Sequence, residues 1–218
     1  AAVLMEAIQG DAGILPAYPM FMKKLYDLCK KHGILFIDEE VQQGFWRAGH
    51  FFAIENYPGI IPDGIIMGKS IGAGLTLGAF MGRAEIMDCL PAPAHLFTLG
   101  GNAIACAAGN AAFDYYQSEE FQTIYKRNCA DIQKELAALK EKHPDKVAFY
   151  RGRGMSWAIG IAKKDEKGHT IPHGDGSFKV GFRPYEKGLK NITLGKTLPR
   201  EQPTPNMSQE NPHKVFPI

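Results

Sequence analysis

Cysteine is scarce in this sequence, with four residues in 218, and their spacing shows no pairs. Small secreted scaffolds need dense disulfides, so the low count favours a reduced, cytoplasmic protein. The net charge at pH 7 is only +2, a field too weak to indicate a nucleic-acid partner. No apolar run approaches the ~20 residues of a membrane-spanning helix, so we expect no membrane segment. The chain is nevertheless 45% hydrophobic, enough for the core of one or two domains.

Three common site motifs are also missing. Residues 68–70 have the Gly-Lys-Ser ending of a phosphate-binding P-loop, but that motif needs a glycine where the sequence has Asp63. Gly72 and Gly74 could begin a dinucleotide fingerprint, but its third glycine would fall on Leu77. The Gly-x-Ser-x-Gly turn of α/β hydrolases occurs nowhere. An unrelated hydrolase or nucleotide-binding module therefore has no motif to support it.

One lysine stands at a position suited to chemistry. The apolar run 65–67 is short and bounded by Pro62 and Gly68, which is typical of a buried strand, and Lys69 follows it. An amine at the mouth of a strand loses part of its hydration, which favours its neutral form. A neutral lysine can attack a carbonyl carbon and form a Schiff base. Taken alone, however, most lysines at strand ends are solvated surface groups.

A second predicted strand ends in acids. Residues 34–38 are mainly apolar, and Asp38, Glu39 and Glu40 follow in sequence. In open α/β sheets ligands bind at the carboxyl ends of strands, so two neighbouring ends would offer a carboxylate and the Lys69 amine to one crevice. Pyridoxal phosphate (PLP) uses both groups, a lysine for its aldehyde and an acid for its ring nitrogen. Alone, Glu39 and Glu40 would equally suit a solvated acidic turn.

The first part of the chain predicts a parallel sheet. Residues 16–32 have the apolar periodicity of a helix, and Gly33 suits a left-handed cap at its end. Strands are expected before it, at 3–8, and after it, at 34–38. A strand, a helix and a strand in this order form a right-handed βαβ unit with parallel strands.

The rest of the chain predicts further strands and helices. Strands are expected at 64–67, 79–82, 147–151 and 155–161, and helices at 103–116 and 118–142. Ser118 suits the N-cap of the last helix. Residues 163–176 are polar and glycine-rich, which predicts a surface loop, and the chain from 198 on has the composition of a disordered tail.

Several motifs together resemble one family. They are Glu6–Gly13 (EAIQGDAG), Glu39–Gly49 (EEVQQGFWRAG), Pro62–Asp63 and Gly68–Ser70 (GKS). In this order and at nearly this spacing they resemble the class-III PLP-dependent aminotransferases. The later run 92–102 (APAHLFTLGGN) resembles the amino-acid racemase branch, typified by isoleucine 2-epimerase. The resemblance covers roughly residues 1–160.

The resemblance implies an α/β fold of the PLP transferase type (fold type I). This is a three-layer αβα large domain, here truncated at its N-terminal side, with a partial small C-terminal α/β domain. Residues 1–117 would belong to the PLP-binding large domain, 118–197 to the small domain, and 198–218 to an irregular or disordered tail. The family has further chain before this point, with a phosphate-holding loop and an aromatic that stacks on the ring. We therefore expect a C-terminal fragment that by itself binds PLP weakly or not at all.

The same resemblance assigns the two central site residues. Lys69 corresponds to the lysine that forms the Schiff base with PLP. Glu39 stands where the family has an aspartate bonded to the pyridinium nitrogen. Because side chains alternate along a strand, we expect Glu39 to face the Lys69 crevice and Asp38 to face away.

Three further residues receive roles in the same way. Gln42 would approach the phenolic oxygen of PLP, and Thr98 would reach the phosphate of the cofactor in a neighbouring subunit. Arg200, close to Pro203, is the candidate for binding the substrate carboxylate. These roles imply a homodimer.

The implied reaction starts when the amine of a small amino-acid or amine substrate replaces Lys69. The freed lysine then removes the α-proton, with the ring as electron sink. Return of the proton to the ring-side carbon gives transamination, and return to the α-carbon gives racemisation or epimerisation. The run 92–102 favours racemisation. The alternatives are a class-III aminotransferase that passes an amino group to a keto acid, and a non-catalytic truncated remnant.

Overall fold

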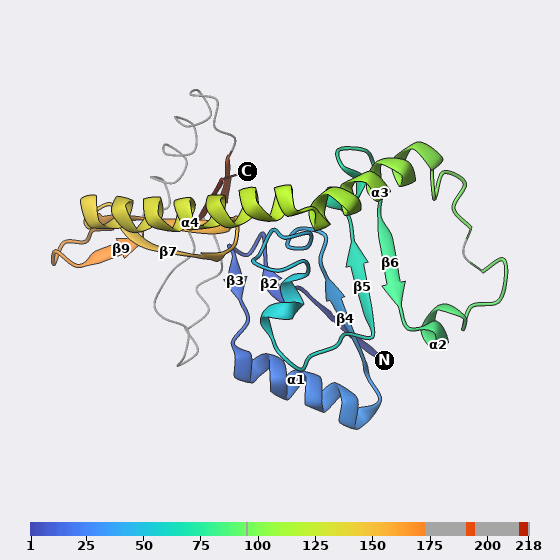
Figure 1. Cartoon of the computed structure of the whole chain (residues 1–218). Helices are drawn as coiled ribbons and strands as arrows, with labels where there is room; N and C mark the ends of the chain where they lie inside the picture. Colours follow the sequence, from blue (N-terminus) through green and yellow to red (C-terminus); the bar gives the residue numbers. More distant parts are fainter. Residues whose placement is uncertain (95, 173–190, 195–213, 218) are drawn as a thin grey trace. The chain divides into compact units, whose positions relative to one another are not determined.

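The computed structural model describes residues 1–94, 96–172, 191–194 and 214–217 (Figure 1). The chain divides into two compact units. The first contains Ala1–Ile8 and Pro16–Lys126, and the second contains Gln9–Leu15 and Arg127–Ile218. The candidate site residues Glu39, Gln42, Lys69 and Thr98 all belong to the first unit.

A four-stranded sheet forms the centre of the first unit (Figure 1). In spatial order its strands are β1 (Ala2–Met5), β4 (Leu35–Glu39), β5 (Gly64–Met67) and β6 (Ala79–Gly82). β1, β4 and β5 are parallel, whereas β6 is antiparallel to β5. The predicted βαβ unit is confirmed as β1, helix α1 (Pro19–His32) and β4. The carboxyl ends of β4 and β5 therefore lie at the same edge of the sheet.

Helix α1 ends as its sequence predicts. Gly33 has a left-handed conformation, with φ 62°, and its N–H group bonds the carbonyl oxygens of Cys29 and Lys30. Glycine adopts this conformation without a Cβ penalty, which is why it closes the helix. Met22 and Cys29 are buried, and the ring of Tyr26 meets that of Phe36 in β4 edge-to-face, 5.8 Å between centroids.

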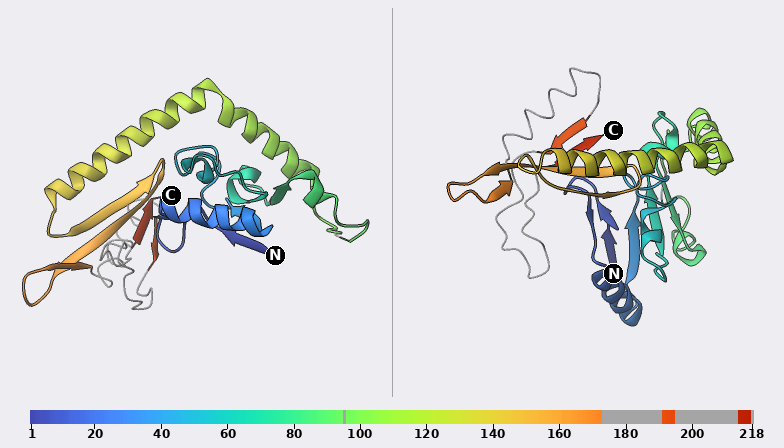
Figure 2. Two further views of the ribbon diagram at one scale, coloured as in Figure 1. Left: turned by 90° about the horizontal axis from the view of Figure 1, so that it is seen from below. Right: turned by 60° about the vertical axis from the view of Figure 1, so that its left-hand side comes forward.

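Two helices follow the sheet with a sharp bend between them. The first is α3 (Ala103–Gln117), which follows the short helix α2 (Ala84–Met87), and the second is α4 (Glu119–Lys142). Ser118 caps both: its Oγ donates to the carbonyl of Tyr115 at 2.7 Å and accepts from the N–H of Phe121 at 3.1 Å. Figure 2 shows the bend between the two helices. No helix in the described part of the chain combines the length and apolarity that crossing a bilayer requires.

One apolar core joins the turns that follow β4 and β5. Phe45, from the turn after β4, clusters with Ile65 and Met67 of β5 and with Ile71 of the 3-10 helix η2 (Lys69–Gly72). Half-buried side chains pack around this cluster: Phe51, Phe52, Leu77, Ala79, Phe113 and Tyr116. The last two come from α3, so this helix holds both turns against the sheet.

The second unit is built mainly from antiparallel strands. They are β7 (Val147–Arg153), β8 (Ser156–Lys164) and β9 (Thr170–Pro172), with a separate pair, β10 (Asn191–Leu194) and β11 (Lys214–Pro217). Near the end of β7 the chain needs glycine, because a Cβ at Gly152, with φ 155°, would overlap the carbonyl of Ser156 in β8. Short strands β2 (Ile8–Gln9) and β3 (Leu15–Pro16) pair with each other, and the 3-10 helix η1 (Ala53–Asn56) completes the elements.

Several element predictions need correction. The predicted loop 163–176 begins inside β8 and contains β9. The tail from 198, predicted to be irregular, contains β11, which pairs with β10. The expected strand 3–8 is split into β1 and β2. In each case a strand is defined by pairing with another strand, β9 with β8, β11 with β10 and β2 with β3, and local composition does not reveal that pairing.

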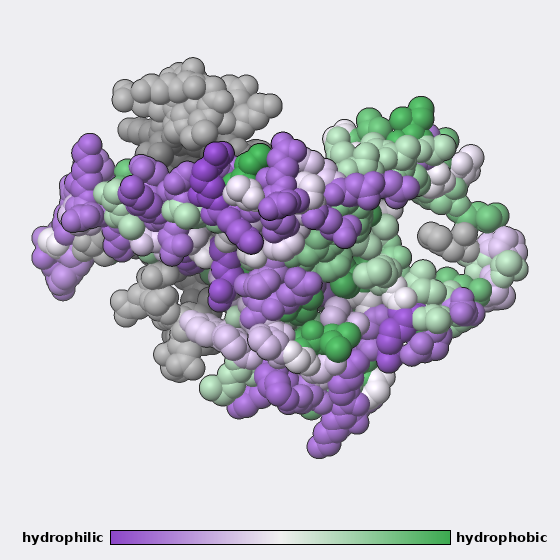
Figure 3. All heavy atoms as spheres, in the orientation of Figure 1, coloured by the Kyte–Doolittle hydropathy of each residue, from purple (hydrophilic) through white to green (hydrophobic). Residues whose placement is uncertain are grey.

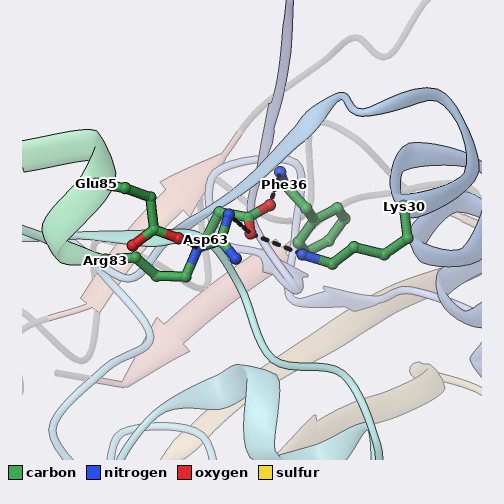
Figure 4. A network of polar contacts seen from close by, with 5 residues as sticks. All are labelled: Lys30, Phe36, Asp63, Arg83 and Glu85. Atoms are coloured by element: carbon green, nitrogen blue, oxygen red, sulfur yellow. Dashed lines mark hydrogen bonds and ion pairs between the residues drawn. The ribbon is translucent and has the colours of Figure 1, made fainter. Parts of the chain in front are cut away.

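Asp63 connects three elements at the opposite end of β4 and β5 (Figure 4). Its Oδ1 contacts Lys30 Nζ of α1 at 2.6 Å and Arg83 Nη2, just after β6, at 3.1 Å. Its Oδ2 accepts the N–H of Phe36 in β4 at 2.7 Å. Burial alone would raise the pKa of Asp63, but the bonds from Lys30 and Phe36 and the charges of Lys30 and Arg83 together lower it.

We expect Asp63→Asn to reduce the free energy of unfolding by about 2 kcal/mol at pH 7, because charge-assisted bonds to a buried carboxylate are lost. The folded pKa of Asp63 lies below the unfolded value, so this stabilisation is present above about pH 4 and is lost as the pH falls through the folded pKa. Urea unfolding at pH 7 and pH 3 measures both effects.

The matched control is Asp27→Asn. Asp27 bonds Lys23 on the surface of α1 with its side chain 55% exposed. Exposed pairs contribute little, so this variant should lose less than about 0.5 kcal/mol. Equal losses in the two variants, or an Asp63→Asn loss that persists at pH 3, would contradict the assignment.

Candidate active site

Lys69 lies two residues after the end of β5 and is exposed. It opens the 3-10 helix η2 in a left-handed backbone conformation, with φ 45°. For a residue with a Cβ this conformation is strained, and such strain is concentrated at functional sites. The predicted short buried strand is confirmed as β5, whereas the expected loss of hydration at Lys69 is not seen, because this residue is exposed.

Glu39 is the last residue of β4 and is half-buried. It pairs in register with Ile66 of β5, and the N–H of the next residue, Glu40, donates to the Ile66 carbonyl at 2.8 Å. One carboxylate oxygen, Oε1, accepts the N–H of Val41 at 2.6 Å, which fixes the direction of the group. Glu39 and Lys69 thus follow neighbouring parallel strands at one edge of the sheet.

The two turns after these strands pack closely. A Cβ added at Gly68, the residue before Lys69, would lie 3.1 Å from Cγ1 of Val41. This contact is tighter than most real Cβ contacts, so a side chain at position 68 would push the Val41 side chain away. The glycine before Lys69 therefore brings the lysine turn against the turn that orients Glu39.

Asp38 and Glu40 flank Glu39 and are both fully buried. Glu40 Oε1 accepts the N–H of Ile54 at 2.9 Å, whereas Asp38 interacts with the backbone of Ala7 and with the carboxyl group of Glu40. The two carboxyl groups lie within hydrogen-bonding reach of each other, which requires one of them to carry a proton. The acidic turn is therefore not solvated at Glu40.

Burial in this pair changes the protonation of Asp38. Desolvation is the largest cause and raises its pKa, and the neighbouring charge of Glu40 and the bond to it raise the pKa further. Burial also raises the pKa of Glu40, against the bonds from Asp38 and from the backbone at Ile54 that lower it. Asp38 is accordingly the protonated partner, and it donates its O–H to Glu40.

Sequence reasoning missed this pair, although its spacing carried a signal. Residues two apart along an extended chain point to the same side. The side chains of Asp38 and Glu40 could therefore be expected to lie next to each other if that side were buried. The cover comes from η1 and from Gly44, where an added Cβ would lie 2.8 Å from the Glu40 carbonyl oxygen.

The other candidate residues are less closely gathered. Gln42 is half-buried in the turn after β4, three residues beyond Glu39. Thr98 is exposed in the loop between α2 and α3. Arg200 lies outside the described residues.

The residues present suit PLP. The exposed Lys69 amine can take the aldehyde, and the oriented Glu39 carboxylate can accept a bond from the ring nitrogen. A lysine and an acid at the ends of adjacent strands in a mixed α/β sheet fit the cofactor site of PLP-dependent enzymes of fold type I.

Comparison with known proteins agrees with this class. The class-III aminotransferase model matches residues 1–216, and the chain belongs to that family. The isoleucine 2-epimerase of Lentilactobacillus buchneri is 36% identical over 93% of this chain and 44% of its own length. The leucine/methionine racemase of Thermococcus litoralis is 35% identical over 96% of this chain and 46% of its own length.

A solved structure agrees as well. A Bacillus anthracis aminotransferase matches with a TM-score of 0.76 and 32% identity, over 89% of this chain and 44% of that one. The chain thus spans less than half the length of the relatives it matches. Members of the family are PLP-dependent enzymes, racemases and epimerases among them as well as transaminases.

We expect Asp38→Asn to stabilise the protein relative to the parent as the pH rises. The pKa of Asp38 is higher in the folded protein than in the unfolded one. In the parent, the free energy of unfolding therefore falls as the pH rises above the unfolded pKa of about 4, and it continues to fall up to the folded pKa. Asparagine can still donate to Glu40 and has no proton to lose. Between pH 5 and pH 8 the variant should gain about 1 kcal/mol or more over the parent in urea unfolding.

Glu39→Gln serves as the matched control, because Glu39 lies between the two paired acids in sequence but is only half-buried, and its Oε1 accepts the Val41 N–H. The difference in free energy of unfolding between Glu39→Gln and the parent should be nearly the same at pH 5 and pH 8. If the free energies of unfolding of Asp38→Asn and the parent differed by the same amount at pH 5 and at pH 8, Asp38 would be ionised in the folded protein.

Proposed function

We propose that this chain forms the Lys69 side of a PLP-dependent active site that acts on a small amino acid or amine. The observation that supports the proposal most strongly is the placement of Lys69 and Glu39 after adjacent parallel strands in a class-III aminotransferase-family chain. When bound, PLP supplies an electron sink that makes the α-proton of an amino acid removable.

The residues of this chain would divide the work around that group. Lys69 Nζ is the attachment point for the aldehyde, and when free it is the base that takes the α-proton. Glu39, held by the Val41 N–H, keeps the ring nitrogen protonated by pairing with it. Gln42 would bond the phenolic oxygen, and Thr98 the phosphate of a neighbouring subunit's cofactor.

The proposed reaction is racemisation or epimerisation of an aliphatic amino acid. In this reaction Lys69 returns the proton to the α-carbon from which it came. The run 92–102 and the two racemase relatives support this choice. The second candidate is amino transfer to a keto acid, which the similarity to an aminotransferase structure supports.

A second copy of the chain is the proposed partner. Five large apolar side chains in the loop before α3 and its first turn are 61% to 80% exposed: Leu90, Leu96, Phe97, Leu99 and Ile104. Figure 3 shows the apolar surface over the start of α3. Patches of this kind usually mark interfaces. Thr98 lies within this run, so a dimer contact here would also bring it towards a neighbouring site.

Isomerisation of one enantiomer tests the reaction. We expect the full gene product, loaded with PLP, to convert L-isoleucine or L-leucine to the epimer or racemate without added keto acid. Lys69→Ala should reduce the rate by at least about a thousandfold, since the base is lost. Chiral chromatography of the amino acid measures the conversion.

Lys24→Ala is the matched control, because Lys24 is an exposed lysine on α1. It should leave the rate unchanged. Turnover that strictly requires a keto-acid acceptor would replace racemisation by amino transfer, and full activity in Lys69→Ala would refute both.

The dimer is tested by a charge in the apolar run. We expect Phe97→Asp to weaken self-association at least about tenfold, because a carboxylate would be buried in the contact. Phe21→Asp is the control, since Phe21 is 53% exposed on α1. Sedimentation velocity measures both. A dimer equally stable in both variants would place the interface elsewhere.

A further inference from the structure

The strained backbone at Lys69 needs support from its surroundings. A non-glycine residue with φ 45° is held in that state only when its neighbours fix it. Within η2 the bonds are Ile71 N–H to the Gly68 carbonyl at 3.2 Å and Ala73 N–H to the Ser70 carbonyl at 3.3 Å. The first lies at the upper end of the usual range and the second just beyond it, so contacts from outside add to the support of this turn.

Tyr116 of α3 supplies such a contact. Its hydroxyl donates to the carbonyl of Ser70, the residue after Lys69, at 3.0 Å. Its ring is held on two sides, 5.9 Å from Phe45 in the turn after β4 and 5.3 Å from Phe121 in α4. Tyr116 therefore touches both turns that carry the candidate site, one through its ring and one through its hydroxyl.

The same helix presses on the turn one residue further along. A Cβ added at Gly109 of α3 would lie 2.9 Å from the carbonyl oxygen of Ile71. The backbone of η2 thus lies directly against α3, with a glycine at the point of closest approach. Because α3 already packs against η2 at Gly109, the hydrogen bond from Tyr116 to Ser70 can hold η2 in a fixed position.

We propose that Tyr116 is a positioning residue that holds the Lys69 turn through Ser70, and so aims the lysine amine at the cofactor. The proposal rests on the function proposed above, in which Lys69 carries PLP. It assigns to Tyr116 a role that ring packing alone does not require.

The hydroxyl stays a donor over the whole range in which the enzyme would work. Burial raises the pKa of Tyr116 above its ordinary value, and the charge of Arg47 opposes this only in part. The O–H to Ser70 is therefore kept up to at least about pH 10.

Tyr116→Phe removes the hydroxyl and keeps the ring. Tyr115→Phe is the matched control, the same change one residue earlier on α3, where the side chain is 45% exposed and its ring meets Phe121 at 5.4 Å. Amide hydrogen exchange is measured on the full gene product without cofactor. The affinity for PLP is then measured by visible absorbance.

In Tyr116→Phe we expect the amides of Ile71 and Ala73 to exchange about tenfold faster, with the amide of Glu40 unchanged. The dissociation constant for PLP should rise about tenfold, since Lys69 is no longer held in place. Tyr115→Phe should match the parent in both measurements.

Exchange in η2 that is the same in Tyr116→Phe and the parent overturns the proposal. Faster exchange with unchanged PLP affinity also overturns it, because the bond would then be structural only. A parent full gene product that binds no PLP through Lys69 refutes the proposed function instead, and the exchange result still shows separately whether Tyr116 holds the turn.

Discussion

The parallel pairing of β4 with β5 is the constraint on which the candidate site depends. It places Glu39 and Ile66 in register, so that the chain leaves both strands at the same edge of the sheet. An acid and a lysine, 30 positions apart in sequence, thereby follow neighbouring strand ends. The rest of the first unit maintains this arrangement: α1 links the parallel strands, and α3 covers the turns beyond them. The chemistry of the site follows from strand order rather than from any local motif.

Buried carboxyl groups stand at both ends of these strands, and the fold accommodates them in two ways. Asp63 keeps its charge because Lys30 and Arg83 face it and the Phe36 N–H bonds it. Asp38 is buried beside another acid, Glu40, and keeps a proton instead. The difference matters for Glu39, which lies between Asp38 and Glu40 in sequence. A second full charge beside it would oppose its own ionisation, and a protonated Asp38 avoids that repulsion.

The strands and helix ends around the site could be predicted from the sequence, whereas contacts between residues far apart in the chain could not. Short apolar runs that end in a polar residue predicted β4, β5 and the position of Lys69, and Gly33 and Ser118 predicted the helix ends. These signals are local. The protonation of Asp38 depends on burial of the Asp38–Glu40 pair beneath η1, whose Ile54 N–H bonds Glu40. The bond from Tyr116 to Ser70 joins residues 46 positions apart. Strands β9 and β11 likewise depend on partners that composition does not reveal.

Covalent trapping tests the central claim most directly. The full gene product is incubated with PLP, reduced with borohydride, digested and mapped by mass spectrometry. The account predicts one phosphopyridoxyl group per chain, on the peptide that contains Lys69, and none when Lys69 is replaced by alanine. A label on a different lysine, or a protein that retains PLP with no label at Lys69, would contradict it.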